Sequence, residues 1–328
     1  MQHRNYSSQE LESLLENKQF SEVREACFQR FTEDHYNVEN NLYLVRAVIG
    51  QLVASAKANV TAEVLEHFIN VGMQFGAVPD EAFSCFFSMY ENYLKQNREE
   101  LPEKGKVLLV IGTGRNGSTS IGAALKKLPN SFITHERPPV IFWDKEESQL
   151  DFHIRFFELA RKYYEYVIDV SHWWLPHLDY MRERLSGLQV IHLQREISKT
   201  LDSWVRIKEI TPGLINHWTD HQGNYWDRNL WDKCYPNVIA FNELGGADNH
   251  VHMRISRLFC ISKYIVDYHL AAQKEIESHN GLNLEIESLF SDDSRKRVLE
   301  FLGCEFDWSR VHLNEGNMKD SQGAPIFL

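Results

Sequence analysis

Hydrophobic residues recur at helical spacing through the first hundred positions of the chain. In one segment Val64, Phe68 and Val71 follow one another at intervals of four and three residues, which places them on one face of a helix. Glycine and proline are scarce from 8 to 96, and turn signals such as Lys18–Gln19 separate the periodic stretches. The pattern predicts a helical region over residues 1–100, built of four or five helices stacked as hairpins. Two roles are open for it: a layer that packs on the next domain, or a surface that binds a protein partner.

The pattern changes at a polar linker, 101–106, and the unbroken apolar run Val107–Ile111 predicts a buried parallel strand. Short apolar strands then alternate with amphipathic helices. The predicted strands are Val107–Ile111, Ser131–Thr134, Tyr166–Val170, Gln189–Leu193 and Leu282–Ile286, and the predicted helices cover 118–128, 148–165, 176–186, 197–210 and 251–279. This alternation predicts an α/β domain over residues 105–328, a doubly wound parallel sheet with an all-α N-terminal extension. Ligands of such sheets bind at the carboxyl ends of the strands, so the residues that follow each strand are the candidates for function.

Composition and charge exclude several classes of protein. The 328 residues carry a formal net charge of -11 at pH 7, which argues against bulk binding to nucleic acid or anionic membranes. Five cysteines without paired spacing indicate neither a disulfide framework nor a zinc ribbon. No window has the length and apolarity of a transmembrane helix or a signal peptide. We therefore expect a soluble cytoplasmic protein that holds any anionic ligand with a few placed cationic groups.

The first predicted strand is followed by a glycine-rich turn, Gly112–Ser120, which opens the next helix. Such a turn exposes backbone N–H groups, and the helix N-terminus adds the positive end of its dipole. The turn also contains an arginine and several hydroxyl groups, which is more than a tight turn requires. We expect a phosphate or sulfate group to bind here.

Two general phosphate-binding patterns overlap with this turn. Gly112, Gly114 and Gly117 have the G-x-G-x-x-G spacing of dinucleotide-binding folds, and Glu136 follows at about the distance of the ribose-binding acid. The nucleoside-triphosphatase loop fits less well, because Ser118 stands where its lysine must be. A kinase or ATPase is thereby disfavoured, and a dinucleotide-binding oxidoreductase stays an alternative.

The run Gly114–Ser120 resembles the 5′-phosphosulfate loop of the sulfotransferases that use 3′-phosphoadenylyl sulfate (PAPS). That loop is usually [KR]-S-G-T-[ST], and Asn116 replaces the commoner serine. The resemblance implies that Arg115 neutralises charge on the transferring sulfuryl group, while the residues after it hold the 5′-phosphate. These residues are Asn116, Gly117, Ser118, Thr119 and Ser120. An arginine inside the turn also crowds a pyrophosphate, which disfavours the dinucleotide interpretation.

A second strand end strengthens the resemblance. Arg195 follows the predicted strand Gln189–Leu193, and Ser203 lies eight positions later, about two turns into the next helix. The two side chains can therefore converge on one anion. The spacing is similar to the R-x7-S element with which sulfotransferases hold the 3′-phosphate of PAPS, although the usual R-D-P is here Arg195-Glu196-Ile197.

A third landmark lies near the C-terminus. The segment Leu282–Gly303 is similar to the family's strand, acidic turn and helix ending in F-L-G. Beyond it, Asn314 and Lys319 lie where the family has a loop that closes over the nucleotide, which implies that they contact the cofactor. The resemblance spans roughly 105–320 and implies a sheet of the P-loop-like sulfotransferase type and a PAPS-dependent sulfotransferase that needs no metal.

Sulfuryl transfer to a hydroxyl needs a base on the far side of the sulfur from the nucleotide. The second predicted strand is followed by His135, Glu136 and Arg137, and the family places a glutamate or histidine base there. We expect Glu136 to be the base, His135 to be the next candidate, and Arg137 to orient the carboxylate or contact an anionic acceptor. After the third strand, His172 is an alternative base and Ser171 an acceptor-side candidate.

The acceptor is not identified by the pattern. Aromatic residues between Trp204 and Trp231 either stack on a sugar or aromatic acceptor or pin a long loop to the core. His217 and His221 are one helical turn apart without a third ligand, so we predict no metal site. The expected acceptor is a small molecule, a carbohydrate or a lipid with a hydroxyl group. A second class of function stays open, a non-catalytic scaffold whose degenerate nucleotide site only stabilises the fold.

Overall fold

The chain is described from a computed structural model and divides into two compact units. The described residues are 6–31, 38–55, 80–95, 105–137, 147–210 and 249–309, with isolated positions between 65 and 78 and at 141. One unit comprises Met1–Glu100 with Pro138–Val140, and the other comprises Leu101–Arg137 with Ile141–Leu328. The division between residues 100 and 101 falls at the start of the polar linker.

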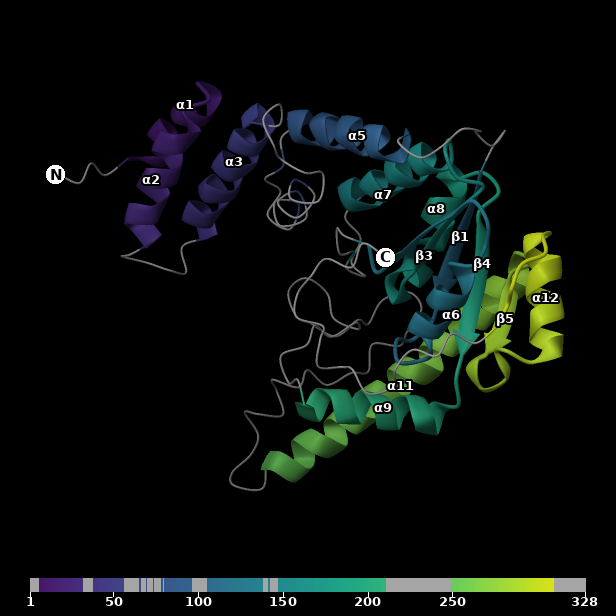
Figure 1. The fold of residues 1–328 in the computed structure, drawn as a ribbon. Coiled ribbons are helices and arrows are strands. Elements are labelled where there is room, and N and C mark those ends of the chain that lie inside the picture. Colours follow the sequence, from purple (N-terminus) through teal and green to yellow (C-terminus); the bar gives the residue numbers. More distant parts are fainter. Residues whose placement is uncertain are drawn as a thin grey trace. The chain divides into compact units, whose positions relative to one another are not determined.

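The first unit is helical, as its periodicity predicts. Its helices are α1 Ser8–Glu16, α2 Phe20–Phe31, α3 Val38–Ser55 and α5 Asp80–Lys95. Helix α1 begins with a capping box, in which the Ser7 and Glu10 side chains each accept a hydrogen bond from the other's backbone N–H. Helices α1, α2 and α3 lie side by side (Figure 1) around a small apolar core that includes Leu11, Val23 and Ala47.

The second unit contains a parallel sheet. Among the described residues, five strands form this sheet in the order β2-β3-β1-β4-β5. They are β1 Lys106–Ile111, β2 Ser131–His135, β3 Tyr166–Val170, β4 Gln189–Gln194 and β5 Leu282–Glu285. Every neighbouring pair is parallel, so the predicted α/β class is confirmed (Figure 1).

The helices of this unit follow the predicted alternation. They are α6 Ser118–Leu125, α7 Glu147–Ala160, α8 Leu178–Arg184, α9 Ile197–Ile210, α11 Asn249–Ser278 and α12 Asp292–Leu302. Leu108 and Val110 of β1 pack on the apolar side chains of α6 and α12, and α9 lies against α11 (Figure 1). None of the described helices combines the length and apolar character needed to cross a bilayer.

Several element boundaries differ from the sequence prediction: the helix expected over 118–128 ends at Leu125, and the helix expected over 148–165 ends at Ala160. The helix expected over 176–186 starts earlier as the 3-10 helix η1, His172–His177, and becomes α-helical only at Leu178. Pro176 lies inside η1, and its missing N–H and its ring oppose a regular α-helix at that point. Strand β5 ends one residue before its expected end, because Ile286 begins the 3-10 turn η2, Ile286–Ser288.

The strand order places between β1 and β4 the kind of switch point at which open α/β sheets have their ligand crevice. From β1 the chain crosses over β3 to reach β2 at one edge of the sheet, whereas from β4 it proceeds to β5 at the other edge. The two connections leave in opposite directions, so the carboxyl ends of β1 and β4 flank the topological switch point at which open α/β sheets bind ligands.

Candidate active site

The turn after β1 is tied to the neighbouring strand. The Asn116 side-chain amide donates to the Leu193 carbonyl oxygen of β4 over 2.9 Å, and Asn116 is only 1% exposed. A Cβ atom on Gly112 would lie 1.7 Å from the Asn116 amide nitrogen, so only glycine fits there. The sequence analysis expected Asn116 to contact the cofactor. Its side chain instead holds the turn against β4.

Gly117 sets the start of α6. Its φ of 85° lies in the left-handed region, and a Cβ atom on it would lie 2.1 Å from the Cδ1 atom of Ile286. Helix α6 begins at Ser118 without a side-chain cap, so the first backbone N–H groups of the helix have no acceptor of that kind. Ser118 and Ser120 are partly exposed and Thr119 is exposed. The turn therefore presents donors at the carboxyl edge of the sheet, as an anion site requires.

Two arginines from distant parts of the chain meet beside this turn. The Arg195 guanidinium, directly after β4, donates to the backbone carbonyl of Arg115 over 2.8 Å. The Arg115 Nε donates to the Ser203 hydroxyl of α9 over 3.2 Å. Burial, and then the Arg195 charge, lower the pKa of the Arg115 guanidinium, which nevertheless stays protonated. The structure thus brings together Arg115, Arg195 and Ser203, which the sequence analysis selected from two separate strand ends.

Carboxylates also lie near these two guanidinium groups. Glu287, in η2, forms an ion pair with Arg195, with its Oε1 4.0 Å from the Arg195 Nε. The negative charge of Glu136 acts on Arg115 against the effects of burial and of the Arg195 charge. Arg115 is half-buried, and desolvated like charges side by side are unfavourable unless an anion lies between them.

Glu136 and His172 form a pair at the ends of β2 and β3. The Glu136 Oε1 lies 3.4 Å from the His172 Nδ1, and the His172 ring is buried while the carboxylate is partly exposed. The Glu136 backbone N–H donates to the Val170 carbonyl over 3.1 Å. The Glu136 charge raises the pKa of Arg115, so its field reaches the crevice. His135 is exposed at the last position of β2, whereas Glu136 and His172 lie together.

Asp169 organises these strand ends and was not among the residues that the sequence analysis selected. Its buried carboxylate accepts hydrogen bonds from the Thr134 hydroxyl at 2.6 Å, the Ser171 hydroxyl at 2.5 Å and the Trp174 indole at 2.7 Å. The backbone N–H of Arg137 lies 3.4 Å away. A single acid in the otherwise apolar strand YVIDV is the signal from which it was recognisable.

Burial corrects two other expectations, for Ser171 and Arg137, and selects between the two roles left open for Trp204. Ser171 is buried and donates to Asp169, so it is not open to an acceptor. Arg137 is 3% exposed with its guanidinium 3.5 Å from the ring centre of Phe156, so it does not offer its charge to an anionic acceptor arriving from solvent. Trp204 is buried in the core, which agrees with the second of the two roles open for it and not with stacking on an acceptor.

Several predicted residues fall outside the described part of the chain. These are Asn314 and Lys319 on the expected nucleotide-closing loop, His217 and His221, and the aromatic residues from Trp218 to Trp231.

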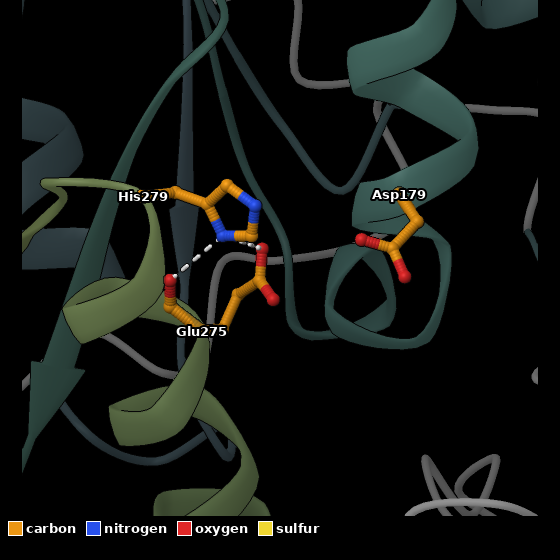
Figure 2. Close-up of side chains that lie close together, drawn as sticks. All are labelled: Asp179, Glu275 and His279. Carbon is orange, nitrogen blue, oxygen red and sulfur yellow. Dashed lines mark hydrogen bonds and ion pairs between the residues drawn. The ribbon is translucent and has the colours of Figure 1, made fainter.

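A second group of polar side chains lies away from the crevice. Asp179 of α8, Glu275 of α11 and His279, directly after α11, offer possible metal-ligand atoms within 4.8 Å of one another (Figure 2). The His279 Nδ1 lies 3.2 Å from both the backbone oxygen and the carboxylate of Glu275. The Arg182 guanidinium pairs with the same Glu275 oxygen, and desolvation lowers its pKa while Asp179 raises it. Because Arg182 already neutralises these acids, we interpret the group as an ion-pair cluster.

Comparison with known proteins adds no relative to this description. The chain matches no family model, and no curated protein matches its sequence.

Proposed function

We propose that this chain is a sulfotransferase that moves a sulfuryl group from PAPS to an acceptor hydroxyl. The observation that supports the proposal most is the convergence of Arg115, Arg195 and Ser203 at the switch point, beside the uncapped start of α6. The sulfotransferase resemblance rests on the same residues, among which Arg115 and Arg195 lie 80 positions apart.

The charged and N–H groups at the switch point suit the binding of a doubly charged nucleotide. The chain as a whole carries a net charge of -11, so an anionic ligand needs a local positive potential to bind. Two guanidinium groups and the N–H groups at the start of α6 supply it, and a guanidinium binds phosphate oxygens with a planar, bidentate geometry. In the proposed assignment Arg195 and Ser203 bind the 3′-phosphate, and the Arg115 loop binds the phosphosulfate end.

The Glu136–His172 pair supplies the base. In the transfer, the acceptor oxygen forms a bond to sulfur while the bond from sulfur to the bridging phosphate oxygen breaks. The acceptor proton passes to the Glu136 carboxylate, and the leaving phosphate oxygen keeps the electron pair beside Arg115. His172 lies against Glu136 and is the alternative base. Positioning and electrostatics supply most of the catalysis in such in-line displacements.

The sheet argues against the dinucleotide alternative. The usual dinucleotide-binding order is 3-2-1-4-5-6, in which β2 lies next to β1 and its terminal acid reaches the ribose. Here β3 separates β1 from β2. Glu136 therefore follows an edge strand and pairs with His172 at the end of β3. The non-catalytic scaffold predicts nucleotide binding without turnover, and the activity measurement below separates it from the enzyme.

Nucleotide binding provides the first test. Adenosine 3′,5′-bisphosphate should bind and raise the melting temperature, and NAD should not. Arg195→Ala should weaken binding at least about tenfold, because a hydrogen bond to a charged group is lost. Arg295→Ala, which removes the same charge from the exposed face of α12, is the matched control and should leave affinity unchanged. Equal affinity in the two variants, or a preference for NAD, would overturn the proposal.

Turnover provides the second test. With PAPS and a panel of hydroxyl acceptors, Glu136→Gln should retain nucleotide affinity and reduce kcat by about 10²–10⁴. The variant keeps the size of the side chain and removes its basicity. If the wild-type protein binds the nucleotide and transfers sulfate to none of the acceptors, the scaffold interpretation is favoured.

A further inference from the structure

Two tyrosines of α11 form hydrogen bonds to the backbone of the candidate active site. Tyr264 and Tyr268 are one helical turn apart, and both are buried. The Tyr264 hydroxyl donates to the Thr113 carbonyl over 3.2 Å. The Tyr268 hydroxyl donates to the His172 carbonyl over 2.8 Å and accepts from the Gly112 N–H over 3.0 Å. Tyr268 is therefore bonded both to the loop after β1 and to His172, the second residue after β3.

The Tyr268 hydroxyl links the segments that follow β1 and β3, at the point where the hydrogen bonds of the sheet between these strands end. The ladder between β1 and β3 ends with the Ser171 N–H donating to the Val110 carbonyl over 3.0 Å. Beyond that bond, Gly112 begins the glycine-rich turn and His172 begins η1. A hydroxyl has one proton to donate and lone pairs to accept, so a single buried group satisfies both backbone partners. Burial raises the pKa of Tyr268, which keeps that proton in place.

We propose that Tyr268 is a positioning residue, which holds His172, and through it the Glu136 carboxylate, at a set distance from the anion-binding turn. The assignment of a catalytic purpose to this distance rests on the proposed function. The bond from Tyr268 reaches the backbone of His172, while the His172 ring contacts Glu136 at 3.4 Å. Movement of that backbone changes the Glu136–His172 contact directly. Tyr264, which bonds the Thr113 carbonyl, supports the turn from the same helix.

The variant Tyr268→Phe removes the hydroxyl and keeps the ring. Tyr166→Phe is the matched control, because the Tyr166 hydroxyl is also buried and also bonds a carbonyl, that of Leu302 at 3.3 Å. Tyr166 begins β3, at the opposite end of the strand from His172. Tyr166→Phe loses the bond to Leu302, whereas Tyr268→Phe loses two bonds, those to His172 and Gly112, and is expected to lose more stability. A purely structural role for Tyr268 predicts no difference between the variants at the His172 ring.

The distinguishing readout is the NMR spectrum at fixed pH. We expect the ring resonances of His172, assigned with His172→Gln, and the amide resonance of Gly112 to move in Tyr268→Phe and not in Tyr166→Phe. Unchanged His172 resonances in Tyr268→Phe would overturn the proposal. Should Tyr268→Phe fail to fold, hydrogen exchange in the wild-type protein decides. A Gly112 amide that exchanges as fast as an open loop amide would mean that the Tyr268 bond does not exist.

Nucleotide affinity separates this proposal from the proposed function. Tyr268→Phe should lower the affinity for adenosine 3′,5′-bisphosphate about tenfold, because the turn loses the hydrogen bond at the Gly112 N–H. If the wild-type protein does not bind this nucleotide, the proposed function fails, while the NMR comparison still tests the position of His172. If the nucleotide binds and both variants match the wild type in affinity and in the His172 resonances, only the role of Tyr268 fails.

Discussion

At the scale of single residues, backbone strain marks the candidate site. Five described non-glycine residues have positive φ. Asn130 and Asn280 are asparagines, which tolerate this region, and Lys18 follows the end of α1. The other two are Arg115, with φ 57°, and Glu136, with φ 51°, each within a few residues of the end of a strand. Strain of this kind persists where the surrounding structure holds it, and it gathers at functional sites.

The first prediction concerns the hydrogen bonds that the Asp169 carboxylate accepts. Asp169→Asn replaces one carboxylate oxygen with an NH₂ group that faces the donors of Thr134, or those of Ser171 and Trp174. We expect the free energy of unfolding to fall by about 2–4 kcal/mol, because buried donors lose their acceptor. Denaturant unfolding measures it.

An exposed aspartate is the control for this substitution. Asp293→Asn lies in the first turn of α12 and should cost less than about 1 kcal/mol through the helix dipole. If the two variants lose the same stability, Asp169 does not organise the strand ends as the hydrogen bonds indicate.

At the scale of secondary-structure elements, two histidines join β4, β5 and α11. The His192 Nε2 lies 2.9 Å from the His269 Nδ1, and the His192 Nδ1 lies 2.8 Å from the Asn283 Oδ1 of β5. Burial, and then the His269 charge, lower the pKa of His192 to about 3. Burial lowers the pKa of His269 to about 4. Both rings are therefore neutral in the folded protein near neutral pH.

This pair predicts a loss of stability in acid. In the unfolded chain both histidines titrate near the ordinary pKa of about 6.5, so below that pH the unfolded chain binds more protons than the folded one. The two neutral histidines make their full contribution to the stability of the folded state above pH 6.5, and this contribution falls as the pH drops towards about 4. The slope is about 1.4 kcal/mol per pH unit for each histidine. Unfolding free energies at several pH values between 7 and 4 measure it.

Removal of one titrating ring tests the cause. His269→Gln should flatten the dependence between pH 6.5 and 4, because only His192 is then left to titrate at this position. An unchanged slope would assign the acid sensitivity to other groups, such as paired carboxylates.

At the scale of the whole molecule, each of the two units has an apolar core of its own. Leu11 and Val23 belong to the core of the helical unit, and Leu108 and Ile191 to that of the α/β unit. Separate cores are the usual basis of separate unfolding transitions. All the described residues of the candidate site belong to the α/β unit.

Calorimetry tests this division. We expect two unfolding transitions. Adenosine 3′,5′-bisphosphate should raise the midpoint temperature of the transition that belongs to the α/β unit and leave the other unchanged. A ligand at 100 times its Kd adds about 2.7 kcal/mol to the stability of the unit that binds it. One cooperative transition that shifts as a whole would contradict the division. Two transitions, neither of which responds to the nucleotide, would argue against the proposed function.

The sequence by itself determined the type of these elements and their order along the chain. Apolar runs and helical periodicity are local properties, so the strands, the glycine-rich turn and the alternation of the α/β unit were predictable from them. Arg115, Arg195 and Ser203 were found because residues that follow parallel strands share one edge of the sheet.

The tertiary structure alone decided which side chains meet. Asn116 bonds a carbonyl 77 positions away, and Tyr268 bonds an N–H 156 positions away. The burial of Trp204 and the pairing of Glu136 with His172 likewise depend on strand order and on the packing of helices against the sheet. No local pattern contains the order β2-β3-β1-β4-β5, because hydrophobic periodicity gives each element an inner face without specifying its neighbour.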